Sequence, residues 1–363
     1  MAATDILFEL ISVSLGQKNS LSETPDESQW KKVFQIAKKQ ALLGVLSPAL
    51  DLIPKSQRPQ IDLYLRWMLI GEKIGEANAA NILRAKEFYH TLAGQGVKSC
   101  ILKGSAFAEY YPDPSLRQSG DIDIWIEGGY EKVLHFLAPK YEIKEIFYHH
   151  CAPKIYPDVE VEAHFMPSWM NCPTLNRRLQ NYYAASSEEQ FSNFKESLGF
   201  SVPTPVFACF HAFVHTFRHL YQEGVGLRQV MDCYHILNSL SADERVQVAK
   251  ELRNIELQKF ASAMMFVLNK VFGLPPDKFI FAPDASAGEF LLKDIISSGN
   301  FGFASKDAKG LYSKNFVVRS FCKARRIARI GRICPPEALW ATYFKLWQKR
   351  WIITVKKRTI ASK

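Results

Sequence analysis

The feature that most constrains the fold is the run at residues 121–126, Asp-Ile-Asp-Ile-Trp-Ile, in which acidic and apolar residues alternate. Because successive side chains of a strand point to opposite faces, Asp121 and Asp123 share one face and the isoleucines share the other. The two carboxylates then lie about 7 Å apart and repel each other unless a cation or solvent lies between them. Hard oxygen ligands of this kind suit Mg²⁺ or Mn²⁺. The alternative is a solvated strand face with two ordinary acids.

A second pattern precedes this run. The residues from Ser99 to Leu102 predict a short strand, Gly104 and Ser105 predict a tight step, and residues 106–111 predict a helical segment. Free backbone amides at the start of a helix, beside a small residue that allows close approach, favour an anion such as phosphate. The alternative is a plain turn.

A third pattern lies at residues 159–165, Val-Glu-Val-Glu-Ala-His-Phe. Its alternation places Glu160, Glu162 and His164 on one face of a strand and the apolar residues on the other. Two acidic strand faces side by side are costly without a counter-charge. A divalent ion is the simplest source of that charge.

These motifs together resemble the DNA polymerase beta-like nucleotidyltransferase superfamily. The matching features are Leu-Lys-Gly-Ser, Tyr-Pro-Asp-Pro, Arg117, Asp-Ile-Asp-Ile and Glu-x-His-Phe, and they look most like its bacterial branch of uncharacterised nucleotidyltransferases. The resemblance covers residues 100–165 and extends more weakly to about residue 240. In that branch the third acid stands two residues before a His and an aromatic residue, which selects Glu162 over Glu160.

The resemblance implies an enzyme that uses an NTP together with Mg²⁺ or Mn²⁺. Its catalytic and metal-binding acids are then Asp121, Asp123 and Glu162. Its nucleotide-binding residues are Lys103, Gly104, Ser105 and Arg117. Arg117 and Lys103 are expected to balance phosphate charge, with neutralisation of the acidic strands as the alternative for both.

Apolar residues recur at helical spacing on both sides of this mixed region. The first part predicts helices over 4–15, 28–50 and 58–93, the last of which is expected to pack on the sheet with Trp67 and Leu69 in the core. Residues 97–165 predict an α+β unit with a small mixed sheet, whose strands are expected at 99–102, 121–126, 141–147, 153–156 and 159–165. The remainder predicts helices, among them 175–183, 187–197 and 204–222.

The predicted fold class is therefore α+β, with a nucleotidyltransferase core flanked by helices. We expect four segments: an N-terminal helical segment packed on the core (1–95), the α+β core (96–167), a helical domain (168–300) and a basic, aromatic-rich helical tail (301–363).

The composition of the chain indicates the compartment in which the protein is located. The start of the chain lacks a basic leader, and no stretch of about 18 apolar residues occurs, so no membrane span is expected. Seven scattered cysteines without a Cys-x-x-Cys pair favour reduced thiols. Together these features predict a cytoplasmic protein.

Charge is concentrated at the end of the chain. Residues 311–363 contain 14 Lys and Arg against one acid, Glu337, whereas the whole chain carries +10. The tail therefore has a net charge of +13 and the rest of the chain −3. The tail also repeats Trp and Tyr between its cations, which fits packing on neighbouring helices, an anionic membrane surface or RNA phosphates.

Two groups of histidines admit several interpretations. His211, His215 and His219 recur every four residues and share a helix face, which fits packing, nucleotide or acceptor contact, or a metal. The run His149-His150-Cys151 contains good zinc ligands. In an extended segment adjacent residues point in opposite directions, so we expect a loop beside the active cleft and no shared ion.

The predicted function is transfer of a nucleoside monophosphate from an NTP to an acceptor hydroxyl, with release of pyrophosphate. The acceptor, whether protein, RNA, sugar or small molecule, is left open by the sequence. The alternative is a non-catalytic nucleotide-binding module whose basic tail binds RNA or an anionic membrane surface.

Overall fold

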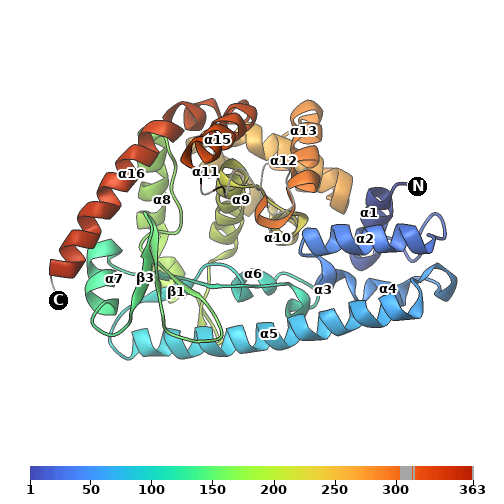
Figure 1. Cartoon of the computed structure of the whole chain (residues 1–363), viewed down its shortest axis with the longest axis horizontal. Coiled ribbons are helices and arrows are strands. Elements are labelled where there is room, and N and C mark those ends of the chain that lie inside the picture. Colours follow the sequence, from blue (N-terminus) through green and yellow to red (C-terminus); the bar gives the residue numbers. More distant parts are fainter. Residues whose placement is uncertain (303–312, 314, 362–363) are drawn as a thin grey trace.

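The computed structural model describes residues 1–302, 313 and 315–361. Its main sheet contains β1 (Ser99–Ile101), β2 (Ile122–Ile126), β3 (Ile143–Ile146), β4 (His150–Pro153) and β5 (Val161–His164). The strand order is β1-β2-β5-β4-β3, in which β2 and β5 are parallel and the other neighbours are antiparallel. This small mixed sheet, with helices on both sides, confirms the predicted α+β class (Figure 1).

The helices fall before, within and after the sheet region. Before it lie α1 (Ala3–Ser14), α2 (Glu27–Lys39), α3 (Leu43–Leu46), α4 (Ala49–Leu52) and α5 (Ile61–Ala93), and within it α6 (Ser105–Ala108) and α7 (Gly129–Leu137). After it come α8 (Pro173–Ser192), α9 (Pro205–Gln222), α10 (Leu227–Ser239), α11 (Ala242–Asn254), α12 (Gln258–Phe272), α13 (Ala285–Ser298), α15 (Phe316–Ile330) and α16 (Pro335–Ala361). Figure 1 shows α5 running along one side of the molecule, below both the N-terminal helices and the sheet.

The two faces of the sheet are covered by different helices. The isoleucines of β2 are buried in a hydrophobic cluster with Phe88 and Leu92 of α5 and with Leu134 of α7. On the opposite face the ring of Trp125 stacks on that of Phe207 of α9, with centroids 5.9 Å apart. The predicted alternation therefore holds for β2: one face packs on α5 and α7, and the acidic face is turned toward the helical region.

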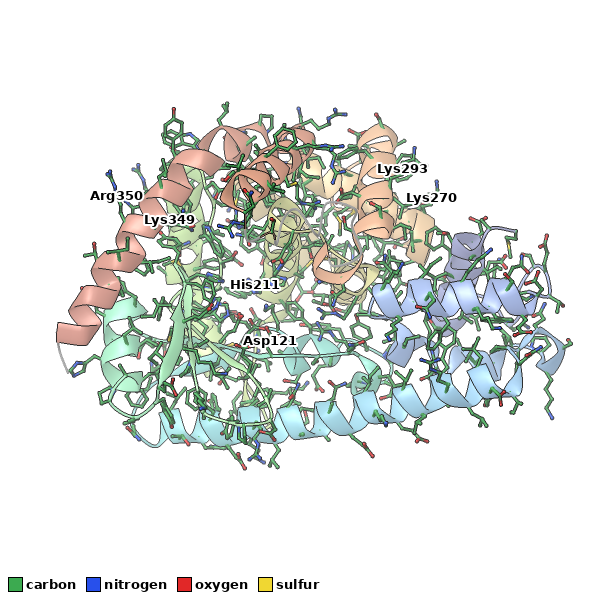
Figure 2. All side chains as sticks on the ribbon, viewed as in Figure 1. Asp121, His211, Lys270, Lys293, Lys349 and Arg350 are labelled. Carbon is green, nitrogen blue, oxygen red and sulfur yellow. The ribbon has the colours of Figure 1, made fainter. Side chains whose placement is uncertain are left out.

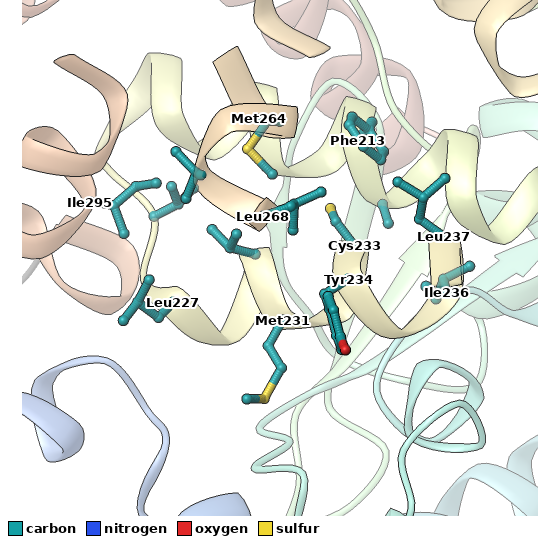
Figure 3. Packing of buried hydrophobic residues seen from close by; sticks show 14 of the residues in the cluster. Phe213, Leu227, Met231, Cys233, Tyr234, Ile236, Leu237, Met264, Leu268 and Ile295 are labelled. Carbon is teal, nitrogen blue, oxygen red and sulfur yellow. The ribbon is translucent and has the colours of Figure 1, made fainter. Parts of the chain in front are cut away.

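A larger hydrophobic cluster joins the N-terminal helices to the helical region. It contains Leu10 of α1, Trp67 of α5 and Leu268 of α12. Figure 3 shows part of it, where Met231 of α10 and Leu268 pack between neighbouring helices. The N-terminal helices therefore pack in the same hydrophobic core as α9 and α10. The division into four segments stays a prediction.

Several local predictions were wrong. The helix expected over 28–50 ends at Lys39, because Ala41 adopts a left-handed backbone (φ 56°) and the chain turns into α3. Leu69 is 50% exposed, since it lies two residues, or about 200°, around α5 from the buried Trp67. The strand expected at 153–156 begins earlier, at His150.

A small hairpin was also missed. α8 joins the helix expected at 175–183 to the first part of the one expected at 187–197 and ends at Ser192, after which the chain forms β6 (Phe194–Lys195) and β7 (Phe200–Ser201). Gly199 allows the tight connection through its positive φ of 76°. Of the predicted tail, residues 303–312, 314, 362 and 363 lie outside the described part of the chain. In the described part, no helix has the length and apolar composition of a membrane span.

A buried ion pair fastens the sheet region to the helical region. Arg117, which follows the short helix η2 (Pro114–Leu116), donates from Nε to Oδ1 of Asp232 at 2.6 Å and from Nη2 to Oδ2 at 2.7 Å. Asp232 lies on α10, and Tyr111 donates to the same carboxylate at 2.7 Å. The three side chains are buried.

We expect Arg117→Met to lower the free energy of unfolding by about 3–5 kcal/mol, because it leaves the Asp232 carboxylate buried without its counter-charge. Equilibrium denaturation measures the change. Arg84→Met is the matched control, since the Arg84–Asp158 pair is open to solvent and its loss should cost far less. Equal losses in the two variants would contradict this interpretation.

Candidate active site

Three acids meet at the centre of the sheet. β2 and β5 are neighbours, and their register pairs Asp123 directly with Glu162. Asp121 stands immediately before β2 on the same side. One ligand atom each from Asp123, Glu162 and His164 lie within 4.8 Å of one another. The structure therefore pairs Asp123 with Glu162, whereas Asp121 lies outside this 4.8 Å group but close enough to feel the charges of both.

The imidazole of His164 bridges two of these acids. Its Nε2 lies 2.9 Å from Oδ1 of Asp123 and 3.4 Å from Oε2 of Glu162. Burial opposes charge on the ring, but hydrogen bonds to Asp123 and Glu162 outweigh it and raise the pKa of His164 to about 9. His164 therefore carries a positive charge at pH 7, as part of the counter-charge that the acidic strands require.

Lys103 supplies the second counter-charge. It follows β1, and its Nζ lies 2.8 Å from Oδ1 of Asp123 and 2.7 Å from Nε2 of His215 on α9. Burial disfavours its ammonium, but the charges of Asp123, Asp121 and Glu162 outweigh burial and raise the pKa of Lys103. Burial also acts against the charged form of Asp123, yet Lys103 and His164 hold its pKa below the usual value.

Asp121 is in the opposite situation. The negative charge of Asp123, and then burial, raise the pKa of Asp121 from 3.8 to about 6. Lys103 offsets this only in part. The two aspartates of the Asp-x-Asp run therefore sit in unequal environments, one fully compensated and the other short of positive charge.

The Gly-Ser turn lies beside Asp121. Gly104 has φ 62° and ψ −115°, a conformation that residues with a Cβ rarely adopt. A Cβ built on Gly104 lies 3.6 Å from the backbone oxygen of Asp121, so the turn and the acid are neighbours. Ser105 begins α6 directly after this turn.

Arg117 is placed differently from the other predicted nucleotide-binding residues. Its side chain is 2% exposed and is directed to Asp232, with Nη1 3.1 Å from Oγ of Ser119. Lys103, Gly104 and Ser105 lie next to the acids, whereas the guanidinium of Arg117 is occupied by the ion pair described above.

Two recesses flank Lys103. A cleft of about 330 Å³ is lined by Lys103, Glu162 and His164 of the sheet region and by His215, Arg218 and His219 of α9. A much smaller recess of about 20 Å³ lies beside Lys103, Ser105 and Asp121. Figure 2 shows Asp121 and His211 in the interior, between the sheet region and the helices that cover it.

Sequence reasoning missed the histidines that surround Glu162. The rings of His149 and His150 are 4.2 Å apart, and both contact the ring of His164. The expectation that neighbouring residues must diverge was wrong for this pair, because His149 lies in a bend before β4, where strand alternation does not apply. Cys151 is buried in the hydrophobic cluster on the other side of the sheet. The signal available in the sequence was the concentration of His in three nearby segments.

Comparison with known proteins places the chain. Residues 26–273 match the model of a family described as uncharacterised nucleotidyltransferase. The chain belongs to this family. The match runs from α2 through the sheet to α12, so membership assigns the protein to the nucleotidyltransferases.

Other comparisons add little. A solved structure of an antigenic nucleotidyltransferase-like protein from Paracoccidioides brasiliensis is 13% identical, with a TM-score of 0.33, over 59% of this chain and 97% of that one. No curated protein matches the chain. The acceptor of this nucleotidyltransferase family member must therefore be sought in the site itself.

We expect Asp121→Asn to raise the free energy of unfolding of the metal-free protein by about 1–3 kcal/mol at pH 7, because Asn removes a charge that the folded state disfavours. A carboxyl whose folded pKa is raised loses stability as pH rises through that pKa. The gain in Asp121→Asn should therefore be absent below about pH 4 and complete above about pH 6.

Thermal unfolding with a chelator at a series of pH values measures this gain. Glu160→Gln, an exposed acid just before β5, is the control and should show no such gain. A clear loss of stability in Asp121→Asn at pH 7 would mean that this carboxylate is a structural group.

Proposed function

We propose that this protein transfers a nucleoside monophosphate from an NTP to an acceptor hydroxyl and releases pyrophosphate. The observation that carries the proposal is the pairing of Asp123 with Glu162, with Asp121 close to both and beside the Gly104–Ser105 turn. In this chemistry the protein contributes mainly positioning and neutralisation of charge. Acids beside a glycine turn provide the elements for both.

The donor set fits Mg²⁺ or Mn²⁺. The carboxylates of Asp121, Asp123 and Glu162 are hard oxygen ligands, and the raised pKa of Asp121 reflects a shortage of positive charge around it. These three residues would hold the ions. Bound there, divalent cations neutralise the triphosphate and lower the pKa of a coordinated acceptor hydroxyl.

The chain's own residues divide the remaining tasks. The amides and hydroxyl of the Gly104–Ser105 turn are placed to hold the β- and γ-phosphates, and Lys103 to balance their charge. Glu162 is 26% exposed in the cleft, and its hydrogen bond to His164 keeps its pKa low despite burial. It is thus an ionised carboxylate positioned to accept the acceptor's proton.

The two recesses suggest where each substrate binds. The larger cleft borders Glu162, while the narrow recess borders Asp121 and Ser105. We assign the triphosphate to the Asp121 side and the acceptor to the Glu162 side, with Lys103 lining both. The narrow recess has room for about one water, so nucleotide binding requires side-chain rearrangement around Lys103.

Asp123→Asn and Glu162→Gln are each expected to reduce pyrophosphate release by more than about 100-fold, because one removes a metal ligand and the other the proton acceptor. The assay screens the four NTPs with Mg²⁺ or Mn²⁺ against cell extract and follows which molecule becomes labelled. Glu160→Gln is the matched control, an acid two residues from Glu162 that lies outside the cluster, and it should retain full activity.

Full turnover in either cluster variant would contradict the proposal. The alternative function, a non-catalytic nucleotide-binding module, predicts saturable binding of an NTP by the wild-type protein without consumption under any metal or acceptor condition. The cytoplasmic location stays a prediction.

A separate surface bears on partners. On α16, the exposed apolar side chains recur at a spacing of three or four residues along one face, with Leu339 74% and Tyr343 69% exposed. The stripe continues through further apolar residues: Trp340, Leu346, Trp347 and Ile353. Lys349 and Arg350 stand on the same exposed part of the helix, where Figure 2 shows Arg350 projecting outward.

We propose that this stripe binds an anionic membrane surface. Within the described part of α15 and α16 the sole acid is Glu337, which is fully buried, so the exposed charges of both helices are cationic. Exposed Leu and Ile side chains contribute to insertion among lipid chains but offer nothing to RNA phosphates. The combination of an aliphatic and aromatic stripe with flanking cations therefore favours a bilayer over RNA.

Replacing both Trp340 and Trp347 with Ser is expected to weaken binding to vesicles of anionic phospholipid at least about tenfold, because two interfacial side chains are lost. Vesicle sedimentation measures binding, and added salt should weaken it. Leu65→Ser, at an exposed position of α5, is the control and should bind as the wild type does. Binding to RNA with no binding to anionic vesicles would overturn the proposal.

A further inference from the structure

Beyond nucleotidyl transfer, we infer that His149, His150 and His164 form a binding site for a transition-metal cation of the Zn²⁺ class, next to the acid cluster but distinct from it in ligand chemistry. One ring nitrogen from each of these residues lies within 4.8 Å of the others. The ring centroids are 4.2, 5.2 and 5.1 Å apart. Nitrogens that share one such ion lie within about 4 Å of each other, so small side-chain rotations complete the site.

Each of the three rings has one nitrogen without a hydrogen-bond partner among the described residues. Within the described part of the chain, His149 Nδ1, His150 Nε2 and His164 Nδ1 are buried and make no hydrogen bond. Buried polar atoms without partners are costly, and three of them in contacting rings are more costly still. Ring rotations that turn these three nitrogens to a common cation, in place of the 3.0 Å contact between His149 Nε2 and His150 Nδ1, would remove that cost.

The second nitrogen of His164 supports the same interpretation. Its Nε2 is hydrogen-bonded to the Asp123 carboxylate at 2.9 Å, while Nδ1 is the nitrogen without a partner. Metal-binding histidines commonly donate their other N–H to a carboxylate, which fixes the ring and makes it a better ligand. An ion bound at Nδ1 replaces a proton there, and Asp123 keeps its hydrogen bond.

The donor types separate this site from the acid cluster. Imidazole nitrogens suit Zn²⁺, Co²⁺ and Ni²⁺, whereas carboxylate oxygens suit Mg²⁺ and Mn²⁺. Glu162 stands between the two groups, with Oε1 3.5 Å from Nε2 of His150. Its charge and that of Asp123 offset the nearby cations Lys103 and Arg218.

The setting also indicates what the ion would do. All three histidines line the cleft of about 330 Å³, so an ion held by them keeps a face open to that cleft. Three protein ligands with an open position are typical of a zinc site that binds substrate, while closed four-ligand sites are structural. The open position is directed into the acceptor cleft, where it would bind an oxygen or anionic group of the ligand that enters there.

Titration of the tag-free, metal-free protein with Co²⁺ tests the inference. We expect a visible absorption band that saturates at one equivalent, is bleached by Zn²⁺ and persists in excess Mg²⁺. His149→Ala and His150→Ala should each weaken Co²⁺ binding at least about tenfold. His135→Ala, an exposed histidine on α7, is the control and should bind as the wild type does. Thermal unfolding of the metal-free variants checks that each is folded.

Two further variants locate the ion. Asp121→Asn alters the acid cluster and should leave the Co²⁺ spectrum unchanged, so the result does not depend on nucleotidyl transfer. His215→Ala removes another imidazole of the cleft and should also retain binding. Absence of a saturable band, full binding in both His149→Ala and His150→Ala, or loss of binding in His215→Ala with those two intact would overturn the inference.

Discussion

The repulsion between carboxylates on adjacent parallel strands is the constraint on which the site depends. Asp123 and Glu162 are register partners in the sheet, and Asp121 lies directly before the same strand. Three negative charges in a largely buried location need compensation. The protein supplies it from two directions: Lys103 from the end of β1 and His164 from β5. Both groups lie close to Asp123, and Asp121 stays short of positive charge.

This compensation requires the helical region as well as the sheet. His215 on α9 contacts the ammonium of Lys103 at 2.7 Å, and the Arg117–Asp232 pair joins the loop before β2 to α10. The ion pair therefore fixes the loop that leads to Asp121, and the guanidinium of Arg117 is bound to Asp232 and Ser119. Arg117 is in this sense a positioning residue, and its place in the sequence close to the aspartates reflects that task.

Strand alternation made part of the site predictable. It placed Asp123 and Glu162 on polar faces because the period of two is local and follows from backbone geometry alone. The pairing of those strands came from the family resemblance. The helix partners of these residues, His215 for Lys103 and Asp232 for Arg117, were not predictable, since each lies more than a hundred residues away in the sequence.

The misplaced elements have the same origin. The helix expected over 28–50 looks continuous by apolar spacing, but the left-handed conformation of Ala41 is set by the packing of α3 against α5. The pair His149–His150 was expected to diverge because adjacent side chains alternate in an extended segment, but His149 lies in the bend before β4. The bend lets both rings face the cleft, and alternation alone could not reveal it.

In the metal-free protein, two protonated side chains supply positive charge beside Asp123. The ammonium of Lys103 and the imidazolium of His164 occupy positions next to Asp123 where a divalent cation would otherwise provide the positive charge. An ion held by Asp121, Asp123 and Glu162 would take over the neutralisation of Asp123, and we propose that Lys103, which lines both recesses, would then turn to phosphate. In this proposal the same lysine stabilises the acids before substrate arrives and binds the nucleotide afterwards. A lysine ammonium at this position can change partners. An arginine held in a buried ion pair would stay in place and would keep substrate out of the site.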